Sequence, residues 1–372
     1  MATATKERKK SAKGGTVLSA ETLRRALAEV NAAVPTKHPR AVLTNVLLHD
    51  GSLTGTDLEL EVSAEIPWTG ERLLLPYQRL QAIVRECRAD EVSITVDGTS
   101  AVVSAGHGTW RLPVEDSQEF PSWEAESPKP VCRMPADQFV RSCKAVVYAT
   151  DNESSRYALG AVLIDVKGSQ CVFVATDGRR LSMVEIEHDL AVDDQQVLVP
   201  ARALHAMQLI AAGHGDTAVQ LEATSREVVA TIDGSVVTAR QIEGRFPRWR
   251  DVFPAREATP HVVEIVQLLN ATRAAAIVTT ENSKGVSYTF GPDGIVLHGQ
   301  SAENGESTVT CDVVSAGTAC TTKLDPAFVA EFLRALPADG EPNVEIEAVD
   351  AGSAVVLRCG DVRGVIMPLA AE

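Results

Sequence analysis

The sequence lacks the short motifs by which nucleotide-binding and hydrolytic sites are most often recognised. It contains no phosphate loop of the form GxxxxGK(S/T), no HExxH pair and no GxSxG elbow. Its eight histidines are dispersed, and none lies within four residues of another. These absences disfavour an enzyme of any of those classes, and we predict a protein without catalytic residues.

Cysteine is present, but in no pattern that binds a metal. The seven residues include no CxxC pair, and no histidine lies at zinc-ligand spacing from them. An odd, scattered set is typical of reduced, half-buried thiols in a cytosolic protein. We therefore predict no metal, no cofactor and a cytoplasmic location.

Long hydrophobic runs are also missing. No apolar stretch approaches the roughly 18 residues that a membrane span requires, and the first residues are too polar for a secretory signal. Residues 1–15 carry five lysines and arginines against a single Glu7 and end in Gly14-Gly15. We predict a disordered, solvated basic tail without membrane contact; a transient contact of this tail with nucleic acid is the alternative.

What the sequence does contain is a threefold repeat. A strand that runs into a proline and then into an amphipathic helix occurs at Leu73–Val84, Val197–Met207 and Thr322–Leu333. The prolines lie at 76, 200 and 326, so the steps are 124 and 126 residues. Proline is tolerated in the first helical turn, where its missing N–H leaves no hydrogen bond unmade. A period of this length indicates repeated domains rather than solenoid repeats, whose units run from about 20 to 50 residues.

Other segments recur in the same order. Amphipathic helices open the units at Ser19–Leu27, Pro135–Arg141 and Val263–Leu269. The middle segment is Leu53–Asp57 in the first unit and Val174–Gly178 in the second, with only the degenerate Leu297–Ser301 in the third. The closing segment is Phe120–Trp123 in the first unit and Phe246–Trp249 in the second, and the third closes with Val365–Leu369. We predict domains at 16–129, 130–256 and 257–372, after the tail of residues 1–15.

The segments between the helices favour antiparallel sheet. Val92–Gly98 and Val228–Gly234 alternate and end in Asp-Gly, which is a hairpin signal, and Val344–Val349 is similar in composition. Two helices with many strands in each unit predict an α+β fold, with the helices on one face of the sheet. Asp57 and Asp177 occupy matching places, which suits a carboxylate that caps a turn better than a catalytic pair.

The net charge of −15 alone argues against binding to nucleic acid, but the distribution of the charges matters more than their sum. The predicted helices carry many of the basic residues, whereas much of the acid lies in strands and loops. The helical basic residues are Arg24, Arg25, Arg79, Arg85, Arg141, Lys144, Arg202, Arg273 and Arg334. If all helices face one way, that face can be positive on an acidic protein. Scattered arginines on solvated helix faces remain the alternative.

Four segments at these spacings closely resemble a known family. Leu53–Glu59, Thr176–Leu181, Gly244–Pro247 and Val365–Leu369 resemble the bacterial sliding clamps, the β subunits of DNA polymerase III, and the resemblance covers about residues 16–369. It implies a head-to-tail homodimer of three similar domains per chain that closes as a ring around double-stranded DNA, without sequence preference. It also implies a hydrophobic pocket for peptides from the replicative polymerase catalytic subunit, the clamp loader and other proteins with a clamp-binding motif.

Geometry independently favours a ring of two chains. A domain of about 124 residues has a radius of gyration near 14 Å, hence a sphere radius of roughly 18 Å. Three such spheres in a triangle leave a hole about 5 Å wide, whereas six in a hexagon leave about 35 Å, which admits a duplex of roughly 20 Å with a layer of water. Enclosure would also explain how an acidic protein retains DNA with only a weak field toward phosphate.

The resemblance assigns residues to three surfaces. The peptide pocket would be formed by Leu159, Thr176, Gly178, Arg179, Arg180 and Leu181 on one wall, Pro247 and Val252 on a second, and Val365, Met367, Pro368 and Leu369 on a third. The resemblance places DNA contacts at Lys37, Arg40, Arg156 and Tyr157, and the charge distribution on the helices adds Arg24, Arg141 and Arg202. At the seam between chains, Arg79 and Ile83 would meet Ile277 and Val278, with Glu303 and Glu306 nearby.

Two departures and two rival readings accompany the resemblance. Family members often have histidine at the position of Arg179 and a basic end, where this chain has Ala370-Ala371-Glu372. From the residues alone, Leu181, Val252 and Val365 would be read as ordinary core. A three-domain interaction scaffold that does not load on DNA is the second hypothesis, and an enzyme with a cleft between repeats is the third.

Overall fold

The computed structural model describes residues 15–123, 127–151, 158–188, 190–215, 217–255, 258–280, 284–337 and 340–370. The chain forms two compact units: residues up to Ser127 with Val229–Ala239, and Pro128–Val228 with Arg240–Glu372. The predicted tail of residues 1–15 lies, except for Gly15, outside the described residues.

The first unit contains two helices and two groups of antiparallel strands. One sheet has the strand order β1-β6-β7-β8, and a second group runs β5-β2-β3-β4-β16. The elements are β1 (Thr16–Ser19), α1 (Ala20–Val30), β2 (Asn45–His49), β3 (Ser52–Thr56), β4 (Leu60–Glu65), β5 (Leu73–Pro76), α2 (Tyr77–Glu86), β6 (Glu91–Asp97), β7 (Ser100–Ala105), β8 (Gly108–Pro113) and β16 (Ser235–Arg240).

The second unit is built on an eight-stranded sheet with the order β13-β10-β11-β12-β24-β23-β22-β17. Its first part contains β9 (Lys129–Pro135), α3 (Ala136–Val147), β10 (Ala161–Lys167), β11 (Gln170–Thr176), β12 (Arg180–Glu187), β13 (Gln195–Pro200), α4 (Ala201–Ala211) and β14 (Ala218–Ala223). β15 (Glu227–Ile232) begins in this unit, and its residues from Val229 on belong to the first unit. β9 pairs with β14.

The remaining elements of this unit are β17 (His261–Glu264), α5 (Ile265–Ala275), β18 (Val286–Gly291), β19 (Gly294–Ser301), β20 (Gly305–Cys311), β21 (Cys320–Leu324), α6 (Pro326–Ala335), β22 (Asn343–Glu347), β23 (Val355–Cys359) and β24 (Val362–Ile366). Four of these strands form a separate sheet in the order β20-β19-β18-β21.

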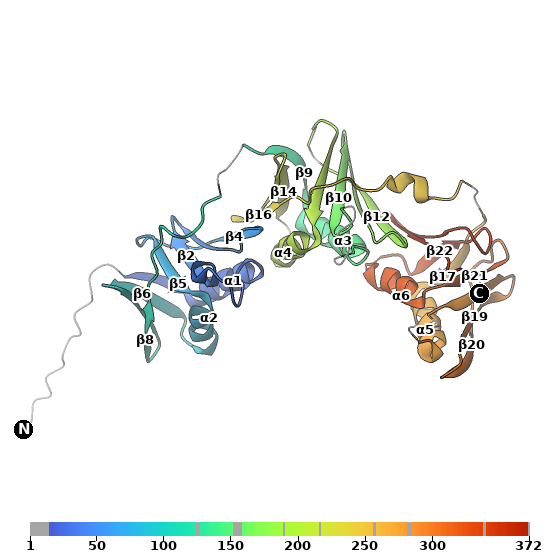
Figure 1. The fold of residues 1–372 in the computed structure, drawn as a ribbon, viewed down its shortest axis with the longest axis horizontal. Helices are drawn as coiled ribbons and strands as arrows, with labels where there is room; N and C mark the ends of the chain where they lie inside the picture. The colour runs from blue at the N-terminus through green and yellow to red at the C-terminus, as the bar shows by residue number, and fades with distance from the viewer. Residues whose placement is uncertain are drawn as a thin grey trace, which may run out of the picture. The chain divides into compact units, whose positions relative to one another are not determined.

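The predicted strand–proline–helix segments are present in all three places. Pro76 and Pro200 end their strands and occupy the residue before the helix, whereas Pro326 is the first helical residue. The helices pack in pairs, α1 with α2, α3 with α4 and α5 with α6 (Figure 1). The predicted opening helices begin slightly later than expected, because Pro135 and His261–Glu264 belong to strands.

Side-chain alternation assigns the two faces of the eight-stranded sheet. Phe173 of β11 contacts Phe139 of α3 edge to face, with ring centroids 6.1 Å apart, so Phe173 lies on the helix side. Its neighbours Val172 and Val174 therefore point to the opposite face. That outer face is also buried, as described below.

The α+β class predicted from the sequence is confirmed, and so are the Asp-Gly hairpins. β15 and β16 are joined by Asp233 and Gly234, both with positive φ (45° and 80°), as a type I′ turn requires. β6 and β7 form the second predicted hairpin, with Gly98 at a φ of 64°.

Candidate functional site

The pairing of β12 with β24 brings the C-terminal residues beside the turn that precedes β12. In this antiparallel register Leu181 lies opposite Val365, and Arg180 lies opposite Ile366. Beyond the strand, the Met367 N–H donates to the Arg179 carbonyl at 2.9 Å, and the Leu369 N–H donates to the Lys323 carbonyl at 2.8 Å. Two of the three predicted pocket walls are therefore joined by main-chain hydrogen bonds.

The turn before β12 is held by its own side chains. The Asp177 Oδ1 accepts the N–H groups of Arg179 and Arg180 at 2.8 and 2.9 Å, and the Thr176 hydroxyl donates to the Arg180 carbonyl. Gly178 has a φ of 86°, and a Cβ at this position would have no other atom within 4 Å. Glycine is therefore favoured there by the backbone conformation and not by lack of space.

The same turn occurs in the first unit. The Asp57 Oδ1 accepts the N–H groups of Glu59 and Leu60 at 3.1 and 2.9 Å, and the Thr56 hydroxyl donates to the Leu60 carbonyl. Leu58 stands in the place of Gly178, with a φ of 80°. The predicted turn-capping role of Asp57 and Asp177 is confirmed.

The Arg180 side chain does not line the accessible surface of the predicted pocket, because it is only 11% exposed. The guanidinium pairs with the Asp177 and Glu331 carboxylates and donates to the Tyr148 carbonyl at 2.8 Å. It also lies over the rings of Phe328 (4.4 Å to the centroid) and Tyr148 (5.2 Å). Burial raises the pKa of the Tyr148 hydroxyl well above its ordinary value. Arg180 therefore ties β12 and α3 to α6.

Arg179 and Met367 form the accessible part of this region. The Arg179 side chain is 57% exposed, lies 3.7 Å from the Asp325 Oδ2, and stacks over Phe328 at 5.0 Å. Met367 is 41% exposed, whereas Pro368 and Leu369 are half-buried. A cation, an aromatic ring and a flexible thioether can together bind an extended peptide with an apolar side chain.

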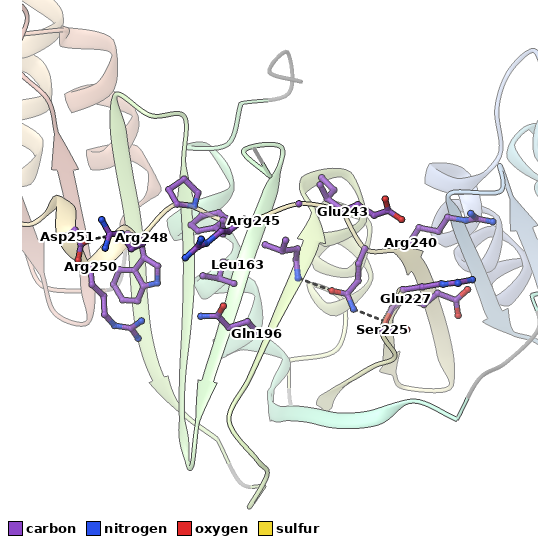
Figure 2. Close-up of a pocket in the computed structure, with 18 residues that line it drawn as sticks. Leu163, Gln196, Ser225, Glu227, Arg240, Glu243, Arg245, Arg248, Arg250 and Asp251 are labelled. Atoms are coloured by element: carbon purple, nitrogen blue, oxygen red, sulfur yellow. Dashed lines mark hydrogen bonds and ion pairs between the residues drawn. The ribbon is translucent and has the colours of Figure 1, made fainter. Parts of the chain in front are cut away.

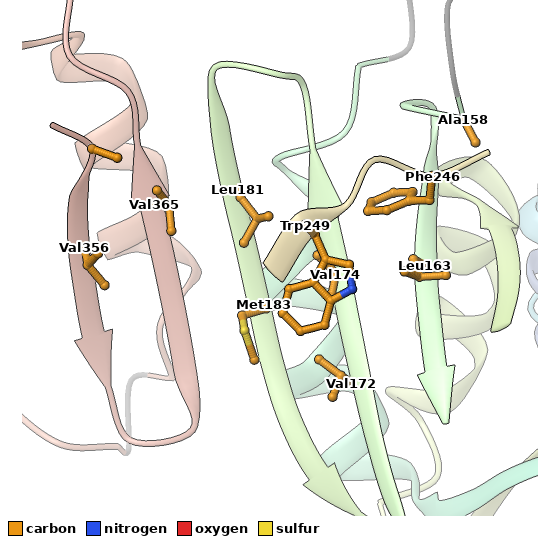
Figure 3. Close-up of a cluster of buried hydrophobic side chains, with 11 residues drawn as sticks. Ala158, Leu163, Val172, Val174, Leu181, Met183, Phe246, Trp249, Val356 and Val365 are labelled. Carbon is orange, nitrogen blue, oxygen red and sulfur yellow. The ribbon is translucent and has the colours of Figure 1, made fainter. Parts of the chain in front are cut away.

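The outer face of the eight-stranded sheet is covered by the segment that follows β16. Figure 3 shows Trp249 lying by Val174, Leu181 and Met183 of the sheet and Phe246 near Leu163, and all of these belong to one cluster with Val356 and Val365. Val252, in the 3₁₀ turn Trp249–Val252, packs against this cluster. Leu181 and Val365 are fully buried, so they support the region from within.

The other predicted pocket residues lie as follows. Leu159 and Thr176 are buried, and Pro247 is half-buried. Tyr148, Asp325, Phe328 and Glu331 were missed by sequence reasoning. Asp325 stood beside the repeated Pro326, but nothing in the sequence indicated that its neighbours on α6 would meet Arg179 and Arg180.

The helices carry basic side chains at the predicted places. Arg24, Arg141 and Arg202 are exposed on α1, α3 and α4, and Arg141 pairs with Asp137 at 2.9 Å. The six α-helices of the described residues contain nine arginines and lysines against five acidic residues (Glu21, Glu29, Glu86, Asp137 and Glu331), whereas the chain has a net charge of −15. Lys37 and Arg40 are exposed on the segment before β2, while Arg156 and Tyr157 lie outside the described residues.

The predicted seam residues divide between the two units. In the first, Arg79 is exposed and Ile83 is buried on α2. In the second, Ile277 is 78% exposed, Val278 is half-buried beside it, and Glu303 and Glu306 are exposed next to and within β20. β8 and β20 each lie at the end of a four-stranded sheet, with largely exposed side chains.

The described residues contain neither a membrane-spanning helix nor a metal-binding cluster. No helix in this part of the chain is long and apolar enough to span a membrane. No group of three or more histidine, cysteine, aspartate or glutamate residues in the same ranges is arranged to hold a metal ion.

Comparison with known proteins identifies two family domains in order along the chain. Residues 16–124 match the N-terminal domain of the DNA polymerase III beta subunit, and residues 133–248 match its central domain. The beta sliding clamp of Escherichia coli K12 is 25% identical over 345 residues, covering 90% of this chain and 93% of the relative. That of Haemophilus influenzae is 25% identical over 369 residues, covering 95% and 98%.

Solved structures have the same fold. A Pseudomonas aeruginosa DNA polymerase sliding clamp superimposes with a TM-score of 0.88 at 24% identity, covering 96% of this chain and all of that chain. The Bacillus subtilis sliding clamp gives a TM-score of 0.88 at 18% identity, covering 96% and 99%.

The Arg180 cluster generates a stability prediction. Replacing Arg180 by Gln leaves the Asp177 and Glu331 carboxylates without their cation, so we expect the free energy of unfolding to fall by about 3 kcal/mol. The adjacent Arg179→Gln variant is the control: its guanidinium is 57% exposed and lies 3.7 Å from Asp325, so its loss should change stability by no more than about 0.5 kcal/mol. Urea unfolding of both variants checks this, and equal stabilities would contradict the bridging role.

Proposed function

The chain belongs to the family of DNA polymerase III beta subunits, the bacterial sliding clamps, and we propose on this premise that it is a DNA processivity clamp without catalytic activity. Two chains of three domains each (16–129, 130–256 and 257–372) close head to tail as a ring around double-stranded DNA. The ring tethers the polymerase catalytic subunit, and it also binds the clamp loader and other proteins that carry a clamp-binding motif. The observation that carries this proposal is the match of both family domains, in order, to most of the chain.

Retention on DNA comes from enclosure rather than from strong contacts. The helices are more basic than the rest of the chain, which suits a weak, sequence-independent attraction to phosphate. Arg24, Arg141 and Arg202 supply part of this attraction. Lys37, Arg40, Arg156 and Tyr157 are further proposed contacts. An acidic protein with this distribution can slide, because no single ion pair holds it at one position.

The seam between chains forms from two exposed sheet edges. β8 of one chain adds to β20 of the other, since an unpaired edge is a ready template for another strand. Ile277, with Val278 behind it, becomes buried against α2, where Ile83 already supports the surface. Glu303 and Glu306 face Arg79 across the seam.

The partner cleft is the region around Arg179 and Met367. Apolar side chains of a partner peptide pack on Met367, Pro368 and Leu369, while Gly178 and Arg179 provide the opposite wall. Leu159, Thr176, Leu181, Pro247, Val252 and Val365 form the base, and Arg180 holds the walls together through α6. The exposed thioether of Met367 can adjust to different partner side chains.

The seam can be tested through the oligomeric state. The wild type should be a dimer of about twice 39.7 kDa. Changing Ile277 and Val278 together to Asp should give monomers, because uncompensated charge would be buried at the seam. Val314→Asp, at an exposed apolar position outside the proposed seam, is the control and should remain dimeric. A monomeric wild type in light scattering would contradict the proposed ring of two chains.

The cleft can be tested by peptide binding. Changing Met367 and Leu369 to Ala should weaken binding of a synthetic peptide from the polymerase's clamp-binding segment, by roughly 1–3 kcal/mol for each truncation. Val266→Ala with Val314→Ala removes exposed apolar groups elsewhere and should have no effect. Equal affinities of wild type and the Met367/Leu369 variant in calorimetry would show that the cleft lies elsewhere, whatever the oligomeric state.

A further inference from the structure

A cavity of about 860 Å³ lies on the outer face of the eight-stranded sheet. Figure 2 shows it between strands β10 and β13, the turn before β15, and the segment that follows β16. Of the proposed pocket residues only Pro247 lines it. The volume falls within the range of about 300–1,000 Å³ that is usual for ligand sites.

The floor of this cavity is set by the pairing of β10 with β13. Leu163 lies opposite Leu198, and Asp165 lies opposite Gln196 one pair further along the same face. The two leucines provide an apolar floor. Asp165 is 2% exposed, accepts a hydrogen bond from the Gln196 amide at 3.1 Å, and pairs with the Arg250 guanidinium at 2.8 Å. This pair anchors the covering segment to the sheet.

The opposite wall is also fixed by hydrogen bonds. The Gln241 Oε1 accepts the Leu198 N–H at 3.1 Å, and its Nε2 donates to the Thr224 carbonyl at 2.7 Å. The Ile242 N–H donates to the Leu198 carbonyl at 3.2 Å, and the Gln241 N–H donates to the Arg226 carbonyl at 2.7 Å. These hydrogen bonds hold the covering segment against the sheet and so fix this wall of the cavity.

The lining is basic although the chain is acidic. Five arginines line the cavity, against the three carboxylates of Glu227, Glu243 and Asp251. Arg250 is engaged with Asp165, and Arg248 pairs with Asp251 at 3.1 Å. Arg226 and Arg245 are exposed and have no ion pair among the described residues. Two guanidinium groups are thus available beside an apolar floor.

One buried donor in the lining also lacks a partner. Trp249 is 6% exposed, and its indole nitrogen has no hydrogen-bond acceptor among the described residues. In Figure 3 that nitrogen lies on the side of the ring nearest Leu163, which is part of the cavity floor. Arg250 stacks on the ring at 4.0 Å and holds it in place. A buried N–H without an acceptor is costly, and an acceptor on a ligand would relieve it.

We propose that this cavity is a second peptide site, which binds a short acidic segment of a partner protein. An apolar side chain of the segment lies on Leu163 and Leu198, flanking carboxylates pair with Arg226 and Arg245, and an acceptor reaches the Trp249 N–H with a small shift of the ring. The site goes beyond the proposed clamp function, because it shares only Pro247 with the cleft. An acidic peptide suits it better than nucleic acid, since the aliphatic floor of Leu163 and Leu198 can bury an apolar peptide side chain.

The probes are three capped hexapeptides that differ only in charge: Glu-Glu-Leu-Leu-Glu-Glu, its glutamine analogue and its lysine analogue. Calorimetry with the full-length dimer should give the acidic peptide the lowest dissociation constant. Two partly exposed ion pairs correspond to about a tenfold preference over the glutamine peptide. The lysine peptide should bind more weakly still, and the preference should shrink as salt is added.

Variants place the binding within the cavity. Arg226→Gln with Arg245→Gln should abolish the tenfold preference, whereas Arg133→Gln with Arg363→Gln, exposed arginines outside the lining, should preserve it. Trp249→Phe keeps a ring but removes the N–H and should raise the dissociation constant by about threefold to fivefold. The Met367/Leu369 alanine variant should bind the acidic peptide as the wild type does, which separates this site from the cleft.

Three results would overturn the proposal. One is equal affinity for the three peptides, and another is an unchanged preference in the Arg226/Arg245 variant. The third is competition by a short DNA duplex that binds through the same two arginines more tightly than the acidic peptide, since that would make the cavity a nucleic-acid contact.

Discussion

The pairing of β12 with β24 is the constraint on which the rest of the second unit depends. Without it, the two halves of the eight-stranded sheet would present open edges, and the outer-face cluster of Leu181, Met183 and Val365 would be split. The pairing also carries Met367 to the Arg179 carbonyl, which no local interaction of the C-terminal residues could achieve. The proposed cleft is thus a consequence of one strand register, and Arg180 reinforces it on the helix side through Glu331.

A second theme is the separation of charge within one acidic chain. Basic residues gather on the six helices and around the cavity of the outer sheet face, while acidic residues prevail elsewhere. Solubility and self-repulsion follow from the net charge, whereas contact with an anionic partner follows from the local field. We therefore propose different partners for the helices and the cavity, the helices acting through diffuse attraction to phosphate and the cavity through a defined pocket.

Much of the fold could be predicted because it repeats. The prolines at 76, 200 and 326 located strand–helix boundaries, and the matched Asp57 and Asp177 predicted a capped turn, since both signals act over a few residues. The roles of Arg180 and Asp165 could not be predicted, because each is defined by a partner far along the chain, Glu331 and Arg250. Leu181 and Val365 were predicted as pocket residues, and they lie beneath the proposed cleft, where both side chains are buried in the cluster that supports it. The cavity was missed because it forms only when residues 240–251 fold back over the sheet.

The central claim, enclosure of DNA by a closed ring, is tested most directly by retention on circular and linear DNA. The protein would be loaded with its clamp loader onto a nicked circular plasmid, separated from free protein by gel filtration at moderate salt, and then exposed to an enzyme that cuts the plasmid once. Enclosure predicts that the protein stays on the circle, leaves after the cut, and stays on cut DNA whose two ends carry bulky protein blocks. If circular and linear DNA release the protein at the same salt concentration, ion pairs rather than topology hold it, and the ring is contradicted.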